Sequence, residues 1–171
     1  NKPQVFELED EARRIAELLT AKPRHSVLLV GPSGVGKTAA IHAMLRDRVK
    51  LGIDQIPFWS TTGARLVAGM SGFGMWEQRC QKLCAELAEK EAIIHLGNLV
   101  ELMQVGRSEM RSQGIASFLR PRIRRGDITA IAECTPEQLM AIEREDSQLL
   151  SAFTVVHLSV PDESRIRRIV E

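Results

Sequence analysis

The stretch Gly31-Pro-Ser-Gly-Val-Gly-Lys-Thr38 fits the pattern G-x-x-x-x-G-K-[ST] of a phosphate-binding loop. In this pattern the glycines bring backbone N–H groups against phosphate oxygens, while Lys37 adds a positive charge and the Thr38 hydroxyl can ligate Mg²⁺. The helix that should follow points its positive N-terminal end at the same anion. We therefore predict a nucleotide site. Its candidate residues are Pro32, Ser33, Gly34, Val35, Gly36, Lys37, Thr38 and Ala39.

The sequence around this loop alternates between short apolar runs and helical periodicity. Strands are expected at Val27–Val30, Ile56–Ser60, Ala92–Leu96, Asp127–Ala132 and Phe153–Val160. Helices are expected at Leu8–Ala21, Thr38–Val49, Gly74–Lys90, Met110–Arg125, Pro136–Arg144 and Asp162–Val170. Such alternation predicts an α/β fold whose mostly parallel sheet is covered by helices on both faces. Ligands of these sheets bind at the carboxyl ends of the strands, which is where the loop falls.

The composition excludes several classes of partner. The net charge of 171 residues is +1, so no strong field favours nucleic acid or a membrane surface. The basic residues Arg120, Arg122, Arg124 and Arg125 are interpreted as a solvated helix end. The three cysteines form no C-x-x-C pair, which fits a reducing cytoplasm. Cys80 and Cys84 lie four positions apart on an expected helix, so both are predicted to face the core.

Six segments, in this order, resemble the first AAA+ module of Clp unfoldases and disaggregases. Phe6–Leu19 resembles the opening helix of that family, and Val27–Thr38 resembles its Walker A strand and loop. Leu66–Arg79 resembles the pore-loop segment L-V-A-G-A-K-Y-R-G-E-F-E-E-R. Phe118–Asp127, Ala132–Leu139 and Val160–Ser164 resemble L-L-K-P-A-L-A-R-G-E, the sensor-one strand G-A-T-T-x-x-E-Y and the strand-to-helix segment E-P-S-x-E-D. The chain is therefore identified as a Clp-type AAA+ large subdomain.

This resemblance implies a P-loop NTPase fold of three αβα layers around five strands. It also implies ATP or ADP as ligand, with Mg²⁺ on Thr38. Members of the family close into six-membered rings, alone or with related AAA+ subunits, and pull polypeptide through a pore. The helical lid of the family would lie beyond Glu171, so residues 1–171 are expected to be one subdomain of a longer protein.

The hydrolytic positions of this family are altered here. The Walker B pattern of four apolar residues followed by Asp-Glu aligns with Ile93-Ile-His-Leu-Gly-Asn98, which places Gly97 and Asn98 at the two acids. In the family the Asp positions Mg²⁺ and the Glu polarises the attacking water. Asn98 can orient water but cannot accept a proton near neutral pH. Glu133 is a candidate substitute, because the resemblance puts its strand beside the strand of Asn98. A surface role is nevertheless the favoured interpretation of Glu133, and the relocated carboxylate is the alternative.

Three further family positions differ. Sensor one falls on Cys134, whose thiol is a poor hydrogen-bond donor. The two arginine fingers align with Ser151 and Ala152. The pore-loop tyrosine aligns with Gly72, so Phe73 is the candidate to grip polypeptide, although it could equally pack the loop. The opening I-G-R is replaced by Phe6-Glu-Leu8, which weakens the prediction of base contacts.

These observations leave three functions open. The first is a nucleotide-binding, hydrolysis-impaired module in a chaperone assembly, because the phosphate cradle persists while the hydrolytic positions change together. The second is an active ATPase motor that uses relocated groups such as Glu133. The third is an interaction module that binds no nucleotide. A small-molecule kinase with the same loop is disfavoured because no acceptor-substrate signature is visible.

Overall fold

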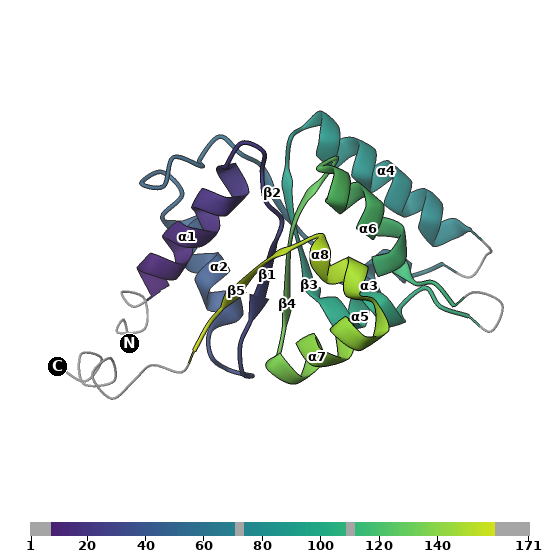
Figure 1. Cartoon of the computed structure of the whole chain (residues 1–171). Coiled ribbons are helices and arrows are strands. Elements are labelled where there is room, and N and C mark those ends of the chain that lie inside the picture. The colour runs from purple at the N-terminus through teal and green to yellow at the C-terminus, as the bar shows by residue number, and fades with distance from the viewer. Residues whose placement is uncertain (1–7, 71–73, 109–111, 160–171) are drawn as a thin grey trace.

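A five-stranded parallel sheet forms the centre of the molecule (Figure 1). The computed structural model describes residues 8–70, 74–108 and 112–159. The strands are β1 (Val27–Val30), β2 (Phe58–Ser60), β3 (Ile93–Asn98), β4 (Thr129–Cys134) and β5 (Thr154–His157). They lie in the order β2-β3-β4-β1-β5, and all four pairings are parallel. The predicted α/β architecture is therefore confirmed.

Helices cover both faces of this sheet, which gives three layers (Figure 1). They are α1 (Glu9–Thr20), α2 (Lys37–Arg46), α3 (Gly63–Val67), α4 (Met75–Glu89), α5 (Leu99–Gln104), α6 (Ile115–Arg125), α7 (Pro136–Glu145) and α8 (Ser147–Ser151). Successive side chains of a strand point to opposite faces. Accordingly Leu29 packs with α1 and α2, whereas Leu28 packs with α4, α5, α6 and α8.

Both faces are filled by fully buried apolar side chains. Cys80 and Cys84 of α4 are buried in the same apolar cluster as Leu28, so their predicted core position is confirmed. Burial raises the pKa of the Cys80 thiol to about 12. Both thiols are therefore protonated and inert packing groups at neutral pH.

Several boundaries differ from the sequence prediction. The second helix ends at Arg46 rather than Val49, and α6 begins at Ile115 rather than Met110, a residue outside the described ranges. The short helices α3, α5 and α8 were not predicted, because five or six residues carry too little periodicity to detect. Each begins at a side-chain cap that the sequence does contain, namely Thr62, Asn98 and Asp146.

Some predicted features cannot be compared with the structure. The helix expected at Asp162–Val170, the pore-loop candidate Phe73 and the segment Phe6-Glu7 lie outside the described residues. Within the described part, no helix combines the length and apolarity that crossing a membrane requires.

Candidate functional site

The phosphate loop connects β1 to α2 with a conformation that leaves the helix N-terminus open. Gly36 is the N-cap of α2, and its φ of 104° lies in the left-handed region that favours glycine. Because glycine has no side chain, no side-chain hydrogen bond caps the helix. The first N–H groups of a helix have no intrahelical partner, so this end offers donors to an anion.

The side chain of Lys37 folds back over the phosphate loop that precedes it. Its Nζ donates hydrogen bonds to the carbonyl oxygens of Gly31, at 2.6 Å, and Pro32, at 3.0 Å. The ammonium is thus held over the loop by backbone carbonyl oxygens of the loop itself. The cradle, the open helix end and this cation fit a nucleotide phosphate, as the sequence predicted for Pro32–Ala39.

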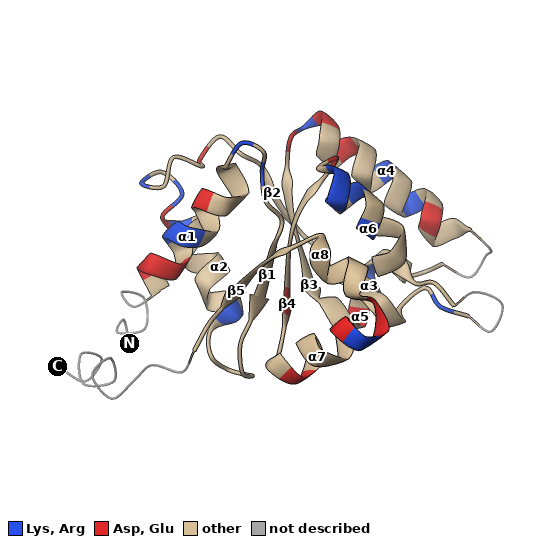
Figure 2. Cartoon of the chain, in the orientation of Figure 1, with Lys and Arg blue, Asp and Glu red and all other residues tan. Residues whose placement is uncertain are grey.

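The strand next to the loop brings an acidic side chain to the start of α2. The backbone N–H of Gly31 donates to the carbonyl oxygen of Cys134 at 3.2 Å, which ties the loop to the end of β4. Glu133 precedes that cysteine, and its Oε1 accepts a hydrogen bond of 2.8 Å from the Thr38 hydroxyl. Figure 2 shows this acid as a single red segment on the otherwise uncharged β4.

A histidine from the next strand completes this group. His95 of β3 contacts the other carboxylate oxygen, with 2.7 Å between Nε2 and Oε2 of Glu133. Burial on its own raises the pKa of Glu133, but the hydrogen bonds from His95 and Thr38 and the nearby Lys37 outweigh it. The net result is a pKa below the usual range, so Glu133 is ionised at neutral pH.

The end of β3 has a different geometry from a straight strand. His95 pairs with Ile131 and Asn98 with Glu133, so β3 carries one residue more than β4 over this interval. Gly97 lies in this irregularity with a φ of 74°, a conformation that a bulge places on glycine. Position 97 therefore has no side chain, and its backbone conformation disfavours any residue other than glycine.

Asn98 is occupied in holding local structure. Its Oδ1 accepts the backbone N–H of Glu101 at 3.1 Å, which makes Asn98 the N-cap of α5. Its Nδ2 donates to Oε1 of Gln138 at 3.0 Å. Gln138 belongs in turn to the capping box of α7 with Thr135. Both polar atoms of Asn98 are thus engaged away from the phosphate loop.

The sensor position carries a buried thiol. Cys134 is 0% exposed in the apolar cluster on the α6 face of the sheet. Burial raises the pKa of this thiol to about 11, although the charge of Lys37 lowers it in part. The protonated thiol is a weak donor, and its neighbour Thr135 accepts from the backbone N–H of Gln138.

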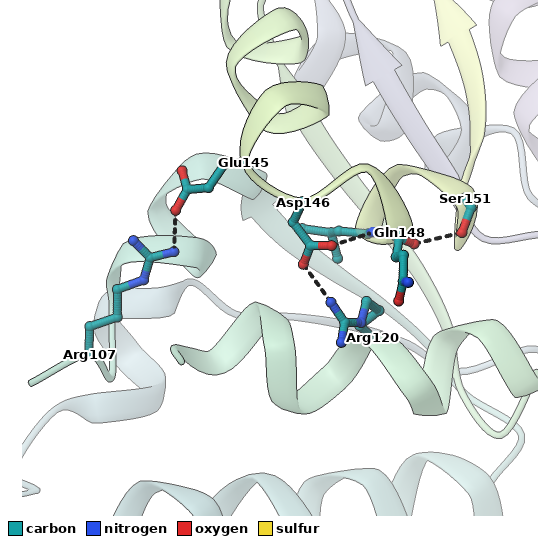
Figure 3. A network of polar contacts seen from close by, with 7 residues as sticks. Arg107, Arg120, Glu145, Asp146, Gln148 and Ser151 are labelled. Atoms are coloured by element: carbon teal, nitrogen blue, oxygen red, sulfur yellow. Dashed lines mark hydrogen bonds and ion pairs between the residues drawn. The ribbon is translucent and has the colours of Figure 1, made fainter. Parts of the chain in front are cut away.

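The α7–α8 edge, where the resemblance would place arginine fingers, is built from local contacts (Figure 3). The Ser151 hydroxyl donates to the carbonyl of Gln148. Asp146 caps α8 by accepting from the backbone N–H of Leu149, and its other oxygen accepts from Arg120 at 2.8 Å. Arg107 contacts Glu145. The two arginines that Figure 3 labels are therefore both turned toward carboxylates of this edge.

The structure brings together only some of the residues that the sequence singled out. Glu133 and Thr38 meet, whereas Asn98 and Ser151 serve as a cap and a helix end. The surface role favoured for Glu133 is wrong, because the residue is 8% exposed and both of its carboxylate oxygens are hydrogen-bonded. His95 was missed. The signal for it was present, since a histidine within the apolar run Ile93–Leu96 needs a buried polar partner.

Comparisons with known proteins agree with this geometry. A family model described as "ATPase family associated with various cellular activities (AAA)" matches residues 27–154. The chaperone protein ClpB of Porphyromonas gingivalis is 29% identical over 165 residues, which cover 93% of this chain and 19% of that protein. ClpB 2 of Parasynechococcus marenigrum is 30% identical over 166 residues, covering 92% of this chain and 18% of that protein.

Solved structures show the same fold. The Saccharomyces cerevisiae Hsp104–ADP complex superimposes with a TM-score of 0.74 at 23% identity, covering 95% of this chain and 24% of that one. A closed state of Hsp104 with ATPγS and casein gives a TM-score of 0.75, also at 23% identity, and covers 95% of this chain and 28% of that one. The resemblance to Clp-type AAA+ modules is thus confirmed. The chain spans about a fifth of the length of the curated relatives it matches.

Proposed function

This chain belongs to the AAA family of ATPases, and from that premise we propose that it binds ATP or ADP but is impaired in hydrolysis. One observation carries the proposal. The phosphate loop keeps its open helix end and its lysine, whereas Asn98, at the position of the family's water-activating acid, is engaged as the cap of α5. Within the part of the chain that the structure describes, the module keeps the parts for binding and has no acid or arginine at the family's hydrolytic positions.

The loop residues account for binding. Backbone N–H groups of residues 33–38 would hold the phosphates, and Lys37 would exchange its carbonyl partners for phosphate oxygens. The Thr38 hydroxyl is the ligand that this chain offers to Mg²⁺, which when bound neutralises charge on the phosphates. Binding of this kind stabilises the folded chain by mass action, by about 2.7 kcal/mol at a ligand concentration of 100 Kd.

Hydrolysis requires groups that the described residues do not supply at the family positions. A general base must accept a proton from water, and the amide of Asn98 cannot do so. An arginine finger contributes about 10³–10⁵ in rate, but Ser151 and Ala152 stand at those positions. The nucleotide then acts as a structural ligand or a switch and is not hydrolysed to drive movement.

The wider role follows from the Clp relatives. We infer that the module assembles into a ring, as a hexamer or with related AAA+ subunits in the cytoplasm, and that its nucleotide state biases contacts with a polypeptide substrate. The altered α7–α8 edge limits what a neighbouring subunit receives from this chain. Such a subunit contributes to assembly and transmits nucleotide binding without driving translocation itself.

An active ATPase is the second candidate, and the hydrogen bond between Thr38 and Glu133 favours it. A carboxylate beside the loop could in principle take a proton from water. Both oxygens of Glu133, however, already accept hydrogen bonds, from Thr38 and His95. This arrangement fits a group held toward a cation better than a base free to meet water.

Calorimetry with ATP and ADP, combined with a turnover assay on the full-length protein, separates these functions. We expect binding without measurable phosphate release. Turnover at the rate of about 10 s⁻¹ that is typical of enzymes would contradict hydrolysis impairment and favour the motor. An absence of binding with both nucleotides would overturn the proposal and favour an interaction module.

A further inference from the structure

Three polar side chains from three elements form one hydrogen-bonded row beside the phosphate loop. Thr38 lies in the first turn of α2, Glu133 comes from β4 and His95 comes from β3. The distances are 2.8 Å from Thr38 Oγ1 to Glu133 Oε1 and 2.7 Å from Glu133 Oε2 to His95 Nε2. Thr38 is exposed at the loop, whereas Glu133 is 8% exposed. The row therefore runs from the open loop into the sheet.

The alternation of the strands explains why these residues meet. Ile131 and Ile93 pack on the α1–α2 face, so Glu133 and His95, each two positions further along its strand, point to that same face. Because β3 and β4 are neighbours, the two side chains come side by side. The face is the one that α2 covers, which brings both within reach of Thr38.

The row lies beside the position at which the Clp family has an acid and this chain has none. In the Clp pattern an acid stands at Gly97 on β3, but here the position is a glycine, which has no side chain and lies in the bulge with a φ of 74°. The acid of this chain stands one strand over, on β4. Burying a lone carboxylate in the strand Thr129–Cys134 would cost stability unless it were paired. His95, at a position that is apolar in the pattern, supplies that pairing.

We propose that Glu133 carries the magnesium-positioning role vacated at Gly97, and that His95 is a positioning residue that holds its carboxylate against Thr38. The inference rests on the proposed nucleotide binding and deepens it. Thr38 donates its only proton to Glu133, so its oxygen lone pairs stay available to a cation. Mg²⁺ prefers oxygen ligands and is held by one or two carboxylates together with substrate phosphates and water. Nucleotide binding is therefore coupled to magnesium through β4 rather than β3.

The test is the ratio of ADP affinity with Mg²⁺ to ADP affinity in EDTA, measured by calorimetry on the full-length protein. Glu133→Gln keeps the shape and the acceptor for Thr38 but removes the charge. It should lower the ADP affinity in Mg²⁺, and with it this ratio, by about 10- to 100-fold, the range for partners that orient metal ligands. The affinity in EDTA should not fall, because the substitution removes a negative charge near the phosphates. Glu137→Gln removes an exposed acid four residues away and is the matched control, with an unchanged ratio.

His95 is tested by a pair of substitutions. His95→Leu removes the hydrogen bond and should lower the magnesium ratio, whereas His95→Gln retains an N–H donor and should restore most of it. A structural role alone would lower the melting temperature of His95→Leu without changing the ratio, and that result would overturn the role of His95. Melting curves of Glu133→Gln identify any loss of folding. If that variant does not fold, His95→Leu carries the test, because its ratio should fall while His95→Gln keeps most of it.

The outcomes separate this inference from the proposed function. If the unchanged protein binds ADP with a magnesium ratio that Glu133→Gln does not alter, the role of Glu133 is refuted while nucleotide binding stands. The role of Glu133 is refuted as well if ADP binding to the unchanged protein does not depend on magnesium. If no nucleotide binds under either condition, the proposed function itself fails.

Discussion

The phosphate loop and the carboxyl end of β3 lie at the same edge of one parallel sheet, but their side chains have different tasks. In the loop, an uncapped helix end and Lys37 present groups that suit an anion. At the end of β3, Gly97 forms a bulge and Asn98 caps α5. Under the proposed function, this difference means that holding a phosphate and cleaving it are separable in this fold. The first needs backbone conformation and one cation, and the second needs several placed side chains.

The largest expected effect comes from the loop. Lys37→Ala removes a charge-assisted contact to phosphate and should weaken ADP binding by about 100-fold, or about 2.7 kcal/mol. Isothermal titration calorimetry measures it. Because Lys37 bonds only to carbonyls of its own loop in the described contacts, the free energy of unfolding should change by less than about 0.5 kcal/mol.

Lys50→Ala is the control for this substitution, since Lys50 is exposed and lies outside the loop. Its ADP affinity should equal that of the unchanged protein. If Lys37→Ala and Lys50→Ala bind ADP equally well, the loop does not hold phosphate. The contrast between a phosphate-binding loop and an altered β3 end would then be wrong for the loop.

The fold could be predicted from the sequence because its signals are long or local. The run Val27–Val30 followed by Gly31–Thr38 marks a buried strand and a phosphate loop, and the structure has both. Boundaries were less accurate where a cap competes with helical periodicity. The second helix stops at Arg46 because the chain turns at Asp47. Caps act through single hydrogen bonds, which periodicity does not reveal.

The site could be predicted only in part. A pattern identifies the loop, and alignment to the family pattern identifies Gly97 and Asn98 as altered. Neither identifies His95, because its partner Glu133 lies 38 residues away in sequence and the two meet only through the pairing of β3 with β4. The irregularity at Gly97 is equally invisible in the sequence, since it depends on the register of two strands.

The intermediate effect lies at the other region and concerns stability. Asn98→Ala removes the acceptor that caps α5 and should lower the free energy of unfolding by about 1 kcal/mol. ADP affinity should stay unchanged, because the side chain is engaged with Glu101 and Gln138. Urea denaturation measures the first quantity and calorimetry the second.

Asn98→Asp is the matched control, because it keeps the capping oxygen and places a negative charge at a helix N-terminus. It should be destabilised less than Asn98→Ala. An Asn98→Ala protein of unchanged stability but weakened ADP binding would reverse the assignment, and Asn98 would then belong with the phosphate loop.

The smallest expected effect tests whether the missing arginine is the decisive defect. Ser151 is exposed at the end of α8, so Ser151→Arg should change the free energy of unfolding by less than about 0.5 kcal/mol. It should also leave turnover at background. A finger accelerates a reaction by about 10³–10⁵ only where the other groups are in place, and Asn98 supplies no base.

Combining Ser151→Arg with Asn98→Glu makes this argument quantitative in an assay of phosphate release by the assembled protein. The glutamate would provide a base at the expense of the α5 cap, and in the proposed ring the arginine would face the neighbouring subunit's nucleotide. Groups that act as a unit are strongly non-additive, so turnover should rise in the double variant and in neither single one. A rise with Ser151→Arg alone would mean that the β3 end already supports hydrolysis. The defect would then lie at the α7–α8 edge rather than at the end of β3.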